Sequence, residues 1–380
     1  MTLAWAVVPG TPAQAATTYK VSYDANGGKG APKSQTKKKG VTLKLSSKKP
    51  TRSTYTFKWW VSDKGVKYQP GGTYTINGNL KLRAVWHLNY VALGDSYSSG
   101  EGAKPEQGEK QFFRDLVFGT RACHRSPLAY GELLDADLSL QLKAFGACTG
   151  ATTRDVTSQQ KLNGKKIAKK QLDYVNSSTG LITITIGGND INFEQIARAC
   201  VQGEACTPDS TTIKTALKAI RKKSFAATLA STYAAILTKA PKAKLVVIGY
   251  PQVGPGREKS GFKPMCAKSG LSSAASFYPV LERDKVRRGI SQGIHLVIGE
   301  LNDVISMAAV KVNGWYPGRV FYVSPNLSGS PFAAGHLCTD NPHINDVVLP
   351  LQYSLHPNYL GHRDYAKVVG AYIKGKKWAK

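Results

Sequence analysis

Hydrophobic and polar residues alternate in short stretches along the first part of the chain, and longer apolar runs follow from residue 89. The alternating stretches lie at residues 19–23, 41–45, 55–60 and 80–86. A period of two predicts strands that are buried on one face. Turn-forming residues such as Asn26-Gly27-Gly28 and Pro70-Gly71-Gly72 separate these stretches. The pattern therefore predicts a small β-rich domain over residues 17–87, with no cysteine and no histidine before His87.

The later apolar runs predict fully buried strands, at residues 90–93, 181–186, 244–249 and 320–323. Stretches with helical periodicity lie between and after them, at residues 224–240, 278–309 and 361–374. Apolar strands that alternate with amphipathic helices indicate a parallel sheet covered on both faces. Residues 89–380 are therefore expected to form one α/β domain of catalytic size.

The amino terminus has the composition of a targeting segment. An apolar core at residues 3–8 precedes the small-residue run Pro12-Ala13-Gln14-Ala15-Ala16. These features are typical of the later half of a secretory signal, so residues 1–16 are interpreted as its remnant and the protein is expected to be secreted. The alternative for this segment is a buried strand. No other stretch approaches the roughly 18 continuous apolar residues of a membrane span, which predicts a soluble mature protein.

The chain is strongly basic. It carries 52 basic and 24 acidic residues, a formal net charge of +28. Such an excess raises nucleic-acid binding as an alternative, but the lysines are scattered and form no recognisable DNA- or RNA-binding motif, so no nucleic-acid partner is expected. The charge fits a monomer that adheres to an anionic cell-envelope polymer or lipid surface, or it serves solubility alone.

Six cysteines form an even set: Cys123, Cys148, Cys200, Cys206, Cys266 and Cys338. In an exported chain an even set favours disulfides over metal ligation, and none of these residues forms a Cys-x-x-Cys pair. Several pairings are open to six cysteines. Cys200 and Cys206 are close enough to close a small loop, and we expect pairing in sequence order.

Candidate chemistry begins where the strand at residues 90–93 runs into the turn Gly94-Asp95-Ser96. A serine delivered to the carboxyl end of a buried strand is a candidate nucleophile. It needs a base to take its proton and donors to hold the oxyanion of the attacked carbonyl. The strand at residues 181–186 ends in Gly187-Gly188-Asn189-Asp190, which supplies an amide donor, and the small-residue turn around Gly150 supplies backbone N–H groups.

Seven histidines are candidates for the base. His356 is the best placed, because the sequence Ser354-Leu355-His356-Pro357-Asn358 forms a turn just before the last predicted helix. His362 is the runner-up.

These four blocks, in this order, resemble those of the SGNH (GDSL) hydrolase family, and the similarity covers residues 89–380. The resemblance implies a three-layer α/β/α, flavodoxin-like parallel sheet. It also implies that Ser96 is the nucleophile and His356 the general base, and that the oxyanion hole consists of the Ser96 N–H, the Gly150 N–H and the Asn189 side chain. The cysteines resemble the three-disulfide pattern of the secreted actinobacterial lipase and esterase branch. That pattern implies the pairs Cys123–Cys148, Cys200–Cys206 and Cys266–Cys338.

One position departs from the family pattern. The family's aspartate lies three residues before the histidine, where this chain has Tyr353. Some secreted lipase-like members orient the imidazole through a main-chain carbonyl, and we expect the Tyr353 carbonyl to do so here, which makes the site a Ser-His dyad. Asp340, Asp346 and Asp364 are the nearby carboxylates that would contradict this hypothesis, and Asp95 is expected to be a structural hydrogen-bonding residue.

The first domain has its own resemblance. Tyr23-Asp24-Ala25-Asn26-Gly27-Gly28, Phe57-Lys58-Trp59-Trp60 and the closing stretch at residues 80–86 look like the Listeria-Bacteroides repeat, an internalin B-repeat-like module of bacterial surface proteins. The resemblance implies a β-grasp-like domain over residues 17–87 that serves attachment or spacing. A stabilising appendage is the alternative.

Together these features predict a secreted carboxylic ester hydrolase, a lipase or esterase that acts on acyl lipids or small esters and is associated with the bacterial cell surface. No metal or cofactor is required for that chemistry. Two alternatives remain open: a carbohydrate O-acetyl esterase of the same fold, and a cell-surface binding protein in which the repeat module is the functional part.

Overall fold

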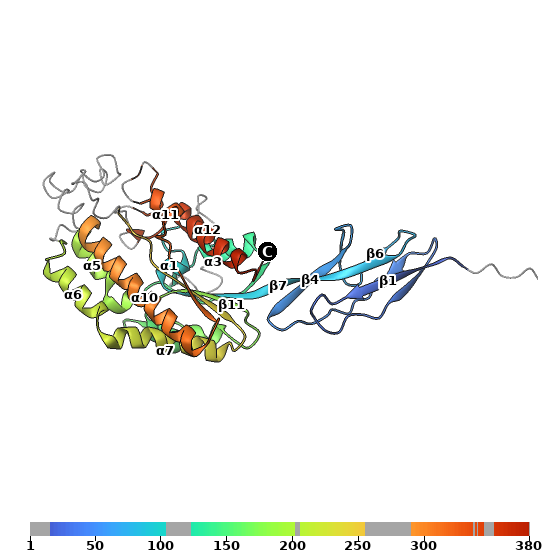
Figure 1. The fold of residues 1–380 in the computed structure, drawn as a ribbon, viewed down its shortest axis with the longest axis horizontal. Coiled ribbons are helices and arrows are strands. Elements are labelled where there is room, and N and C mark those ends of the chain that lie inside the picture. The colour runs from blue at the N-terminus through green and yellow to red at the C-terminus, as the bar shows by residue number, and fades with distance from the viewer. Residues whose placement is uncertain are drawn as a thin grey trace, which may run out of the picture. The chain divides into compact units, whose positions relative to one another are not determined.

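The computed structural model describes residues 16–103, 123–201, 206–254, 290–336, 339, 341–345 and 353–379. The chain divides into two compact units, Met1–His87 and Leu88–Lys380 (Figure 1). The interpretation of residues 1–16 as a signal remnant falls, except for Ala16, outside the described residues.

The first unit consists of strands and turns over residues 16–87. Its strands are β1 (Thr18–Asp24), β2 (Gln35–Lys38), β3 (Leu43–Lys44), β4 (Tyr55–Ser62), β5 (Lys67–Tyr68), β6 (Thr73–Tyr74) and the start of β7 (Leu80–Gly94). Strand β1 pairs antiparallel with β2 and parallel with β7, and β4 pairs with β5 and β7. The inward-facing residues form a core of Val21, Leu45, Trp60, Tyr74, Leu80, Leu82, Ala84 and Trp86. The predicted β-rich domain is confirmed.

Strand β7 contributes to both units, and its burial changes along its length. Buried and solvent-facing positions alternate in its first half, whereas every residue from Leu88 to Gly94 is buried. The first half is covered on one face and the second half on both, which explains the change from an alternating to a continuous apolar pattern. The sequence had predicted two strands with a break at His87–Asn89. The strand continues because the buried Asn89 amide donates a 2.9 Å hydrogen bond to the Ser178 carbonyl.

The second unit is built on a parallel sheet with the strand order β8-β7-β11-β12-β13. Besides β7, the strands of this parallel sheet are β8 (Leu140–Phe145), β11 (Leu181–Thr185), β12 (Lys244–Ile248) and β13 (Val320–Val323). Counted along the chain within this unit, the order is 2-1-3-4-5, which is that of flavodoxin-like folds. The predicted fold class is confirmed.

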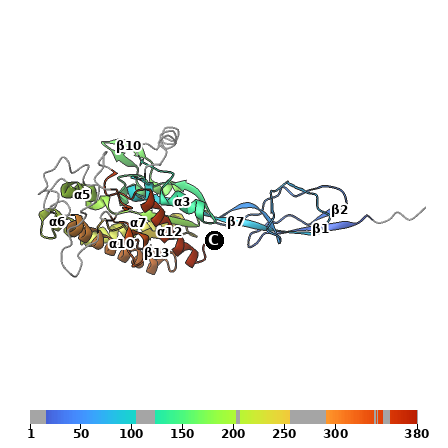
Figure 2. The same cartoon turned by 90° about the horizontal axis from the view of Figure 1, so that it is seen from above.

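Helices cover this sheet (Figures 1 and 2). Because crossovers between parallel strands are right-handed, the connection from β7 to β8 and those from β11 through β13 place their helices on opposite faces. Helix α3 (Tyr130–Asp137) packs with α12 (Tyr359–Gly375), and α7 (Lys223–Lys239) packs with α10 (His295–Trp315). Shorter elements complete the unit: α1 (Ser96–Ser99), α4 (Thr153–Thr157), β9 (Gln160–Leu162), β10 (Lys165–Ala168), α5 (Phe193–Val201), α6 (Thr211–Ile220), a π-helical turn (Ile290–Ile294) and α11 (Pro331–Ala334).

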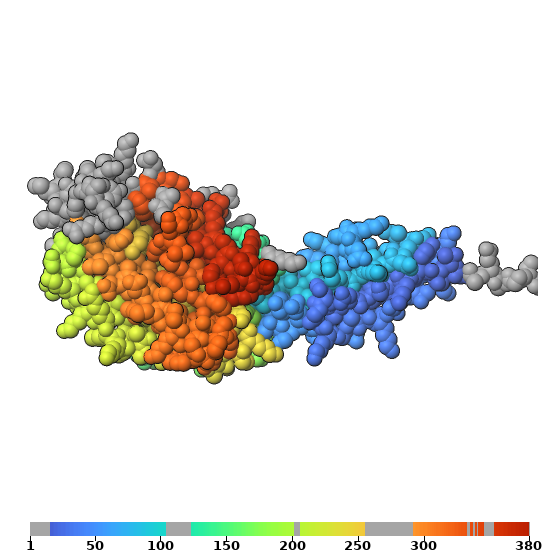
Figure 3. All heavy atoms as spheres, viewed as in Figure 1, coloured from blue at the N-terminus to red at the C-terminus, as the bar shows by residue number. Residues whose placement is uncertain are grey.

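Helix α10 ends at Trp315, later than the predicted end at residue 309, and the predicted start at residue 278 lies outside the described residues. With the preceding turn it makes a stretch, Gln292–Trp315, that by length and composition alone is apolar enough to cross a membrane. It packs against α7 and β13, and about half of it is buried within the unit. Figure 3 shows the part of the chain that includes α10, coloured orange, on one face of the second unit. The contacts are those of a core helix of the second unit.

The strand order determines where a site can form. The chain leaves β7 toward β8 on one side and continues through β11, β12 and β13 on the other, so the crevice at the carboxyl ends of β7 and β11 is the switch point of the sheet. Gly94 at the end of β7 pairs with Thr185 at the end of β11. The turns that carry Ser96 and Asn189 therefore leave the sheet side by side.

Candidate active site

The turn after β7 has a backbone that requires glycine. Gly94 has φ +129°, and a Cβ at this position would overlap Ser98 Oγ and the Thr185 carbonyl oxygen. After this turn the chain enters α1 at once, so Ser96 is the first residue of a short helix at the carboxyl end of the strand. Ser96 is largely buried.

The Asp95 side chain holds this turn against its neighbours. One oxygen accepts hydrogen bonds from the Tyr97 N–H at 3.1 Å and the Thr185 hydroxyl at 2.8 Å, and the other accepts from the Tyr250 hydroxyl. Burial raises the pKa of Asp95 to about 7, against the opposing effect of these hydrogen bonds. Both carboxylate oxygens are thus used in structural contacts.

The structure brings His356 to Ser96. The imidazole Nε2 lies 2.8 Å from Ser96 Oγ, and Nδ1 lies 3.2 Å from the Ser354 carbonyl oxygen. Because a carbonyl can only accept, Nδ1 carries the proton and Nε2 is the acceptor for the serine hydroxyl. The Tyr97 ring packs on the imidazole with centroids 4.9 Å apart, and its hydroxyl donates to the Leu355 carbonyl at 2.8 Å.

The carbonyl at Nδ1 is that of Ser354 and not that of Tyr353, which corrects the expectation from sequence. The Tyr353 carbonyl accepts the backbone N–H of His356 at 3.3 Å and closes a turn, in which Leu355 has φ +62°. Since the turn uses the Tyr353 carbonyl, the following carbonyl faces the ring.

A second segment holds the backbone that carries His356. The Leu355 N–H donates to the Asn345 carbonyl at 3.0 Å, and the Asn345 N–H donates to the His356 carbonyl at 2.8 Å. The Asn345 side chain donates to the Gly102 carbonyl at 3.0 Å. Asn345 therefore ties the histidine segment to the turn that follows α1.

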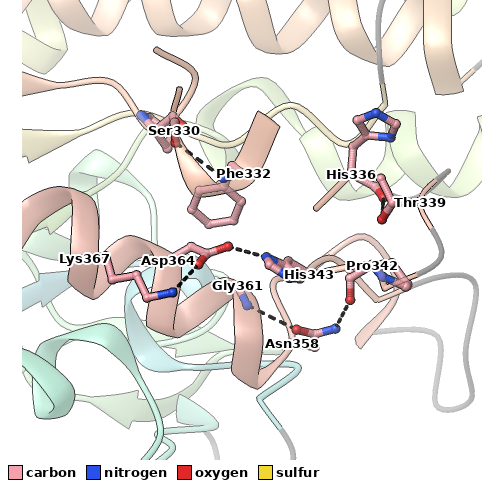
Figure 4. Close-up of polar contacts among 11 residues, drawn as sticks. Ser330, Phe332, His336, Thr339, Pro342, His343, Asn358, Gly361, Asp364 and Lys367 are labelled. Carbon is pink, nitrogen blue, oxygen red and sulfur yellow. Dashed lines mark hydrogen bonds and ion pairs between the residues drawn. The ribbon is translucent and has the colours of Figure 1, made fainter. Parts of the chain in front are cut away.

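Of the three carboxylates expected near His356, Asp364 is the one among the described residues, and it pairs with a different imidazole. Figure 4 shows its side chain, from α12, hydrogen-bonded to His343 Nδ1. Asp364 is 1% exposed, and this contact turns it away from a triad with His356. Asp340 and Asp346 lie outside the described residues.

His362, the runner-up for the base, lies in the core. Its side chain is fully buried, and Nδ1 accepts a 3.4 Å hydrogen bond from the Tyr130 N–H. Burial lowers the pKa of His362 to about 3, so the ring is neutral near pH 7. These contacts are those of a structural histidine.

Two disulfides lie among the described residues: Cys123–Cys148 and Cys200–Cys206. The first anchors the turn that contains Gly150, and the Cys148 N–H donates to the Gly94 carbonyl at 3.0 Å. The Gly150 turn is thereby attached to the end of β7. The expected pair Cys266–Cys338 lies outside the described residues.

The candidate oxyanion donors lie on three turns. Asn189 Nδ2 donates to the Ala151 carbonyl at 2.9 Å, which joins the turn after β11 to the Gly150 turn and leaves the second amide hydrogen. Gly150 has φ +68°. Within the described part of the chain, neither its N–H nor that of Ser96 has a hydrogen-bond acceptor. Unpaired N–H groups beside a nucleophile can bind an anion.

Glu101 is a residue that the reasoning from sequence did not single out. Its carboxylate is buried and accepts hydrogen bonds from His124 Nδ1 at 2.7 Å and from the Thr149 hydroxyl. A charged residue between two glycines, directly after α1, was the available signal. Such a residue is ordinarily a solvated turn residue, and its two partners are distant in sequence.

Comparisons with known proteins give the family of each unit. The model of the GDSL-like lipase/acylhydrolase family matches residues 92–363, and that of the Listeria-Bacteroides repeat domain matches residues 19–85. A lipase from Streptomyces rimosus is 33% identical over 275 residues, which is 72% of this chain and 82% of that protein. The crystal structure of the extracellular lipase from Streptomyces rimosus superposes with a TM-score of 0.54 at 32% identity, over 74% of this chain and 98% of that one. Phospholipase A1 from Streptomyces albidoflavus NA297 gives a TM-score of 0.53 at 28% identity, with the same coverage.

Proposed function

The chain belongs to the GDSL-like lipase/acylhydrolase family and is a carboxylic ester hydrolase, and from that premise we propose that it is a secreted enzyme with Ser96 and His356 as its catalytic dyad. The observation that supports the dyad most directly is the 2.8 Å hydrogen bond between His356 Nε2 and Ser96 Oγ. The Ser354 carbonyl at Nδ1 keeps the ring in the tautomer that can accept the proton.

In the proposed reaction, Ser96 Oγ attacks the ester carbonyl carbon while its proton passes to His356 Nε2. The tetrahedral intermediate collapses, the imidazolium gives the proton to the leaving alcohol, and an acyl-serine ester remains. Water then attacks the acyl carbon as Nε2 takes its proton, and the carboxylic acid leaves as the proton returns to Ser96. Both half-reactions use the same two residues.

The oxyanion that forms in each half-reaction is proposed to accept hydrogen bonds from the Ser96 N–H, the Gly150 N–H and the Asn189 amide. The Ala151 contact holds the Asn189 amide in one orientation before substrate binds. Donors fixed in advance lower the barrier because they need not reorganise during the reaction.

The proposed substrates are acyl lipids or small soluble esters. Two similar proteins are described as a lipase and a phospholipase A1, and the net charge of +28 would concentrate the enzyme at an anionic polymer or lipid surface. The repeat domain is proposed to attach the enzyme to the cell surface. Secretion is supported by the two disulfides, since disulfides persist in oxidising compartments.

Substitution of the nucleophile tests this proposal. Ser96→Ala is expected to abolish hydrolysis of p-nitrophenyl butyrate, with a loss of at least about 10³-fold in kcat, because no other hydroxyl replaces the attacking group. Thermal unfolding should remain cooperative, since only one hydroxyl is removed. Full activity in a folded Ser96→Ala protein would overturn the mechanism.

The acyl specificity is tested with a series of p-nitrophenyl esters from acetate to palmitate. Activity on chains longer than acetate is expected, whereas strict preference for acetate would favour the O-acetyl esterase alternative. Cell-wall binding by residues 17–87 with no ester hydrolysis by the full chain would favour the surface-binding alternative.

A further inference from the structure

The segment Glu101-Gly102 contacts both residues of the proposed dyad. Its backbone N–H donates to the Ser96 carbonyl at 3.2 Å, so it closes the turn that holds the nucleophile. The next residue, Gly102, contacts the other member: a Cβ at Gly102 would lie 2.9 Å from His356 Cβ. Glu101 is 3% exposed, so the segment that contacts both residues of the dyad carries a buried carboxyl group.

The contacts of this carboxyl group are those of an ionised acid. Oε1 accepts from His124 Nδ1 at 2.7 Å and Oε2 accepts from the Thr149 hydroxyl. Burial alone would raise the pKa of Glu101, but the hydrogen bond from His124, the nearby His356 and the hydrogen bond from Thr149 together lower it. Glu101 therefore carries a negative charge at neutral pH.

Among the described residues, the Tyr97 ring packs on the imidazole, and the charges that act on His356 include those of Glu101 after α1, His124, Glu194 on α5 and His362 on α12. Burial lowers the pKa of His356, and among the surrounding charges Glu101 opposes this effect most strongly. Glu194 acts in the same direction as Glu101, and His124 acts in the opposite direction.

We propose that Glu101 is a positioning residue that acts through His356, and that its buried carboxylate stabilises the imidazolium formed when Ser96 gives up its proton. The charge of Glu101 thus replaces the aspartate that the family places where this chain has Tyr353. Unlike that aspartate, Glu101 acts on the imidazolium through its charge alone, while the Ser354 carbonyl orients the ring. This inference rests on the proposed dyad.

The test is the pH dependence of kcat/KM for p-nitrophenyl butyrate in the full chain. In Glu101→Gln the imidazolium loses the charge that stabilises it most, so the acid limb of the profile is expected to move to lower pH by about one unit, with about a tenfold lower plateau. In the matched variant Thr149→Val, Glu101 loses a hydrogen bond and keeps its charge, and the acid limb should stay where it is.

A second variant keeps the test decisive if Glu101→Gln does not fold. His124 has φ +47°, a conformation that asparagine tolerates, and His124→Asn removes an imidazole that lowers the pKa of His356 while the Glu101 side chain is kept. The acid limb is then expected to move to higher pH. An unchanged limb in His124→Asn and in a folded Glu101→Gln would show that Glu101 is only structural. Activity retained by Ser96→Ala would instead overturn the proposed dyad.

Discussion

Two histidines on paired segments of this molecule have opposite environments. His343 lies on the segment 343–345 and donates to the buried carboxylate of Asp364. His356 lies on the segment 355–358 that pairs with it, and donates to the uncharged carbonyl of Ser354. A buried carboxylate is therefore present near the segment that carries His356, but it pairs with the other imidazole.

The comparison shows that the acceptor at His343 and the acceptor at His356 have different effects. A buried carboxylate and an imidazole hold two elements together, and here they join α12 to the segment that supports His356. The backbone on either side strengthens this link: the His343 N–H donates to the Gly335 carbonyl at 2.7 Å, and its carbonyl accepts from the Asn358 N–H at 3.0 Å. The carbonyl beside His356 orients the ring without adding charge, and the other ring nitrogen accepts from Ser96, as the proposed dyad requires.

The largest effect is expected when the two histidines are exchanged for glutamine separately. His356→Gln removes the base and should lower kcat for p-nitrophenyl butyrate by at least about 10³-fold. His343→Gln should lower kcat by less than about tenfold, because the ring contacts no reacting atom, and should lower the midpoint of urea unfolding. Equal losses of kcat in both variants would contradict the division of roles.

A smaller effect is expected from the carboxylate itself. Asp364→Asn weakens the buried contact with His343. It should lower the free energy of unfolding by about 2–4 kcal/mol, measured by urea denaturation. Lys367→Ala is the matched control. Its ammonium lies 3.5 Å from Asp364 on an exposed side chain, so its removal should cost no more than about 0.5 kcal/mol.

The same experiment separates structure from catalysis. At a temperature where Asp364→Asn is fully folded, its kcat should stay within about tenfold of the parent enzyme. A loss as large as that of His356→Gln, with unchanged stability, would mean that Asp364 acts on the reacting groups, and the contrast between the two histidines would fail.

The smallest effect concerns pH. Burial lowers the pKa of His356 below its ordinary value near 6.5, although Glu101 and the Ser354 carbonyl oppose this. The ring must be neutral to accept the serine proton, so activity is lost as the pH falls through this lowered pKa. The acid midpoint of kcat/KM is therefore expected below pH 6.5. A midpoint above 6.5 would indicate that a negative charge dominates around the imidazole.

Several features of the fold were predictable because they depend on neighbouring residues along the chain. The alternation at residues 80–86 and the continuous run at residues 90–93 reflect burial on one face and on two. They did not show that both belong to β7, because the polar Asn89 is accommodated by a carbonyl 89 residues away in sequence.

In the candidate site, too, the features that depend on neighbouring residues were predictable and the others were not. Gly94 has to be glycine because its φ and its contacts exclude a side chain, and this requirement is visible as a glycine after an apolar run. The choice of carbonyl at His356 depends on the turn closed by Tyr353, which is a matter of backbone angles that several residue types can adopt.

By itself the sequence determined the strand and helix pattern, the serine in its glycine turn and the absence of an aspartate at position 353. These features depend on local backbone preference and on the periodicity of burial. Only the tertiary structure decided that Asp364 pairs with His343 and that Glu101 lies buried against His124 and Thr149. Such pairings join residues from separate elements, and a carboxylate acquires its role from the low-dielectric surroundings and the donors that folding brings to it.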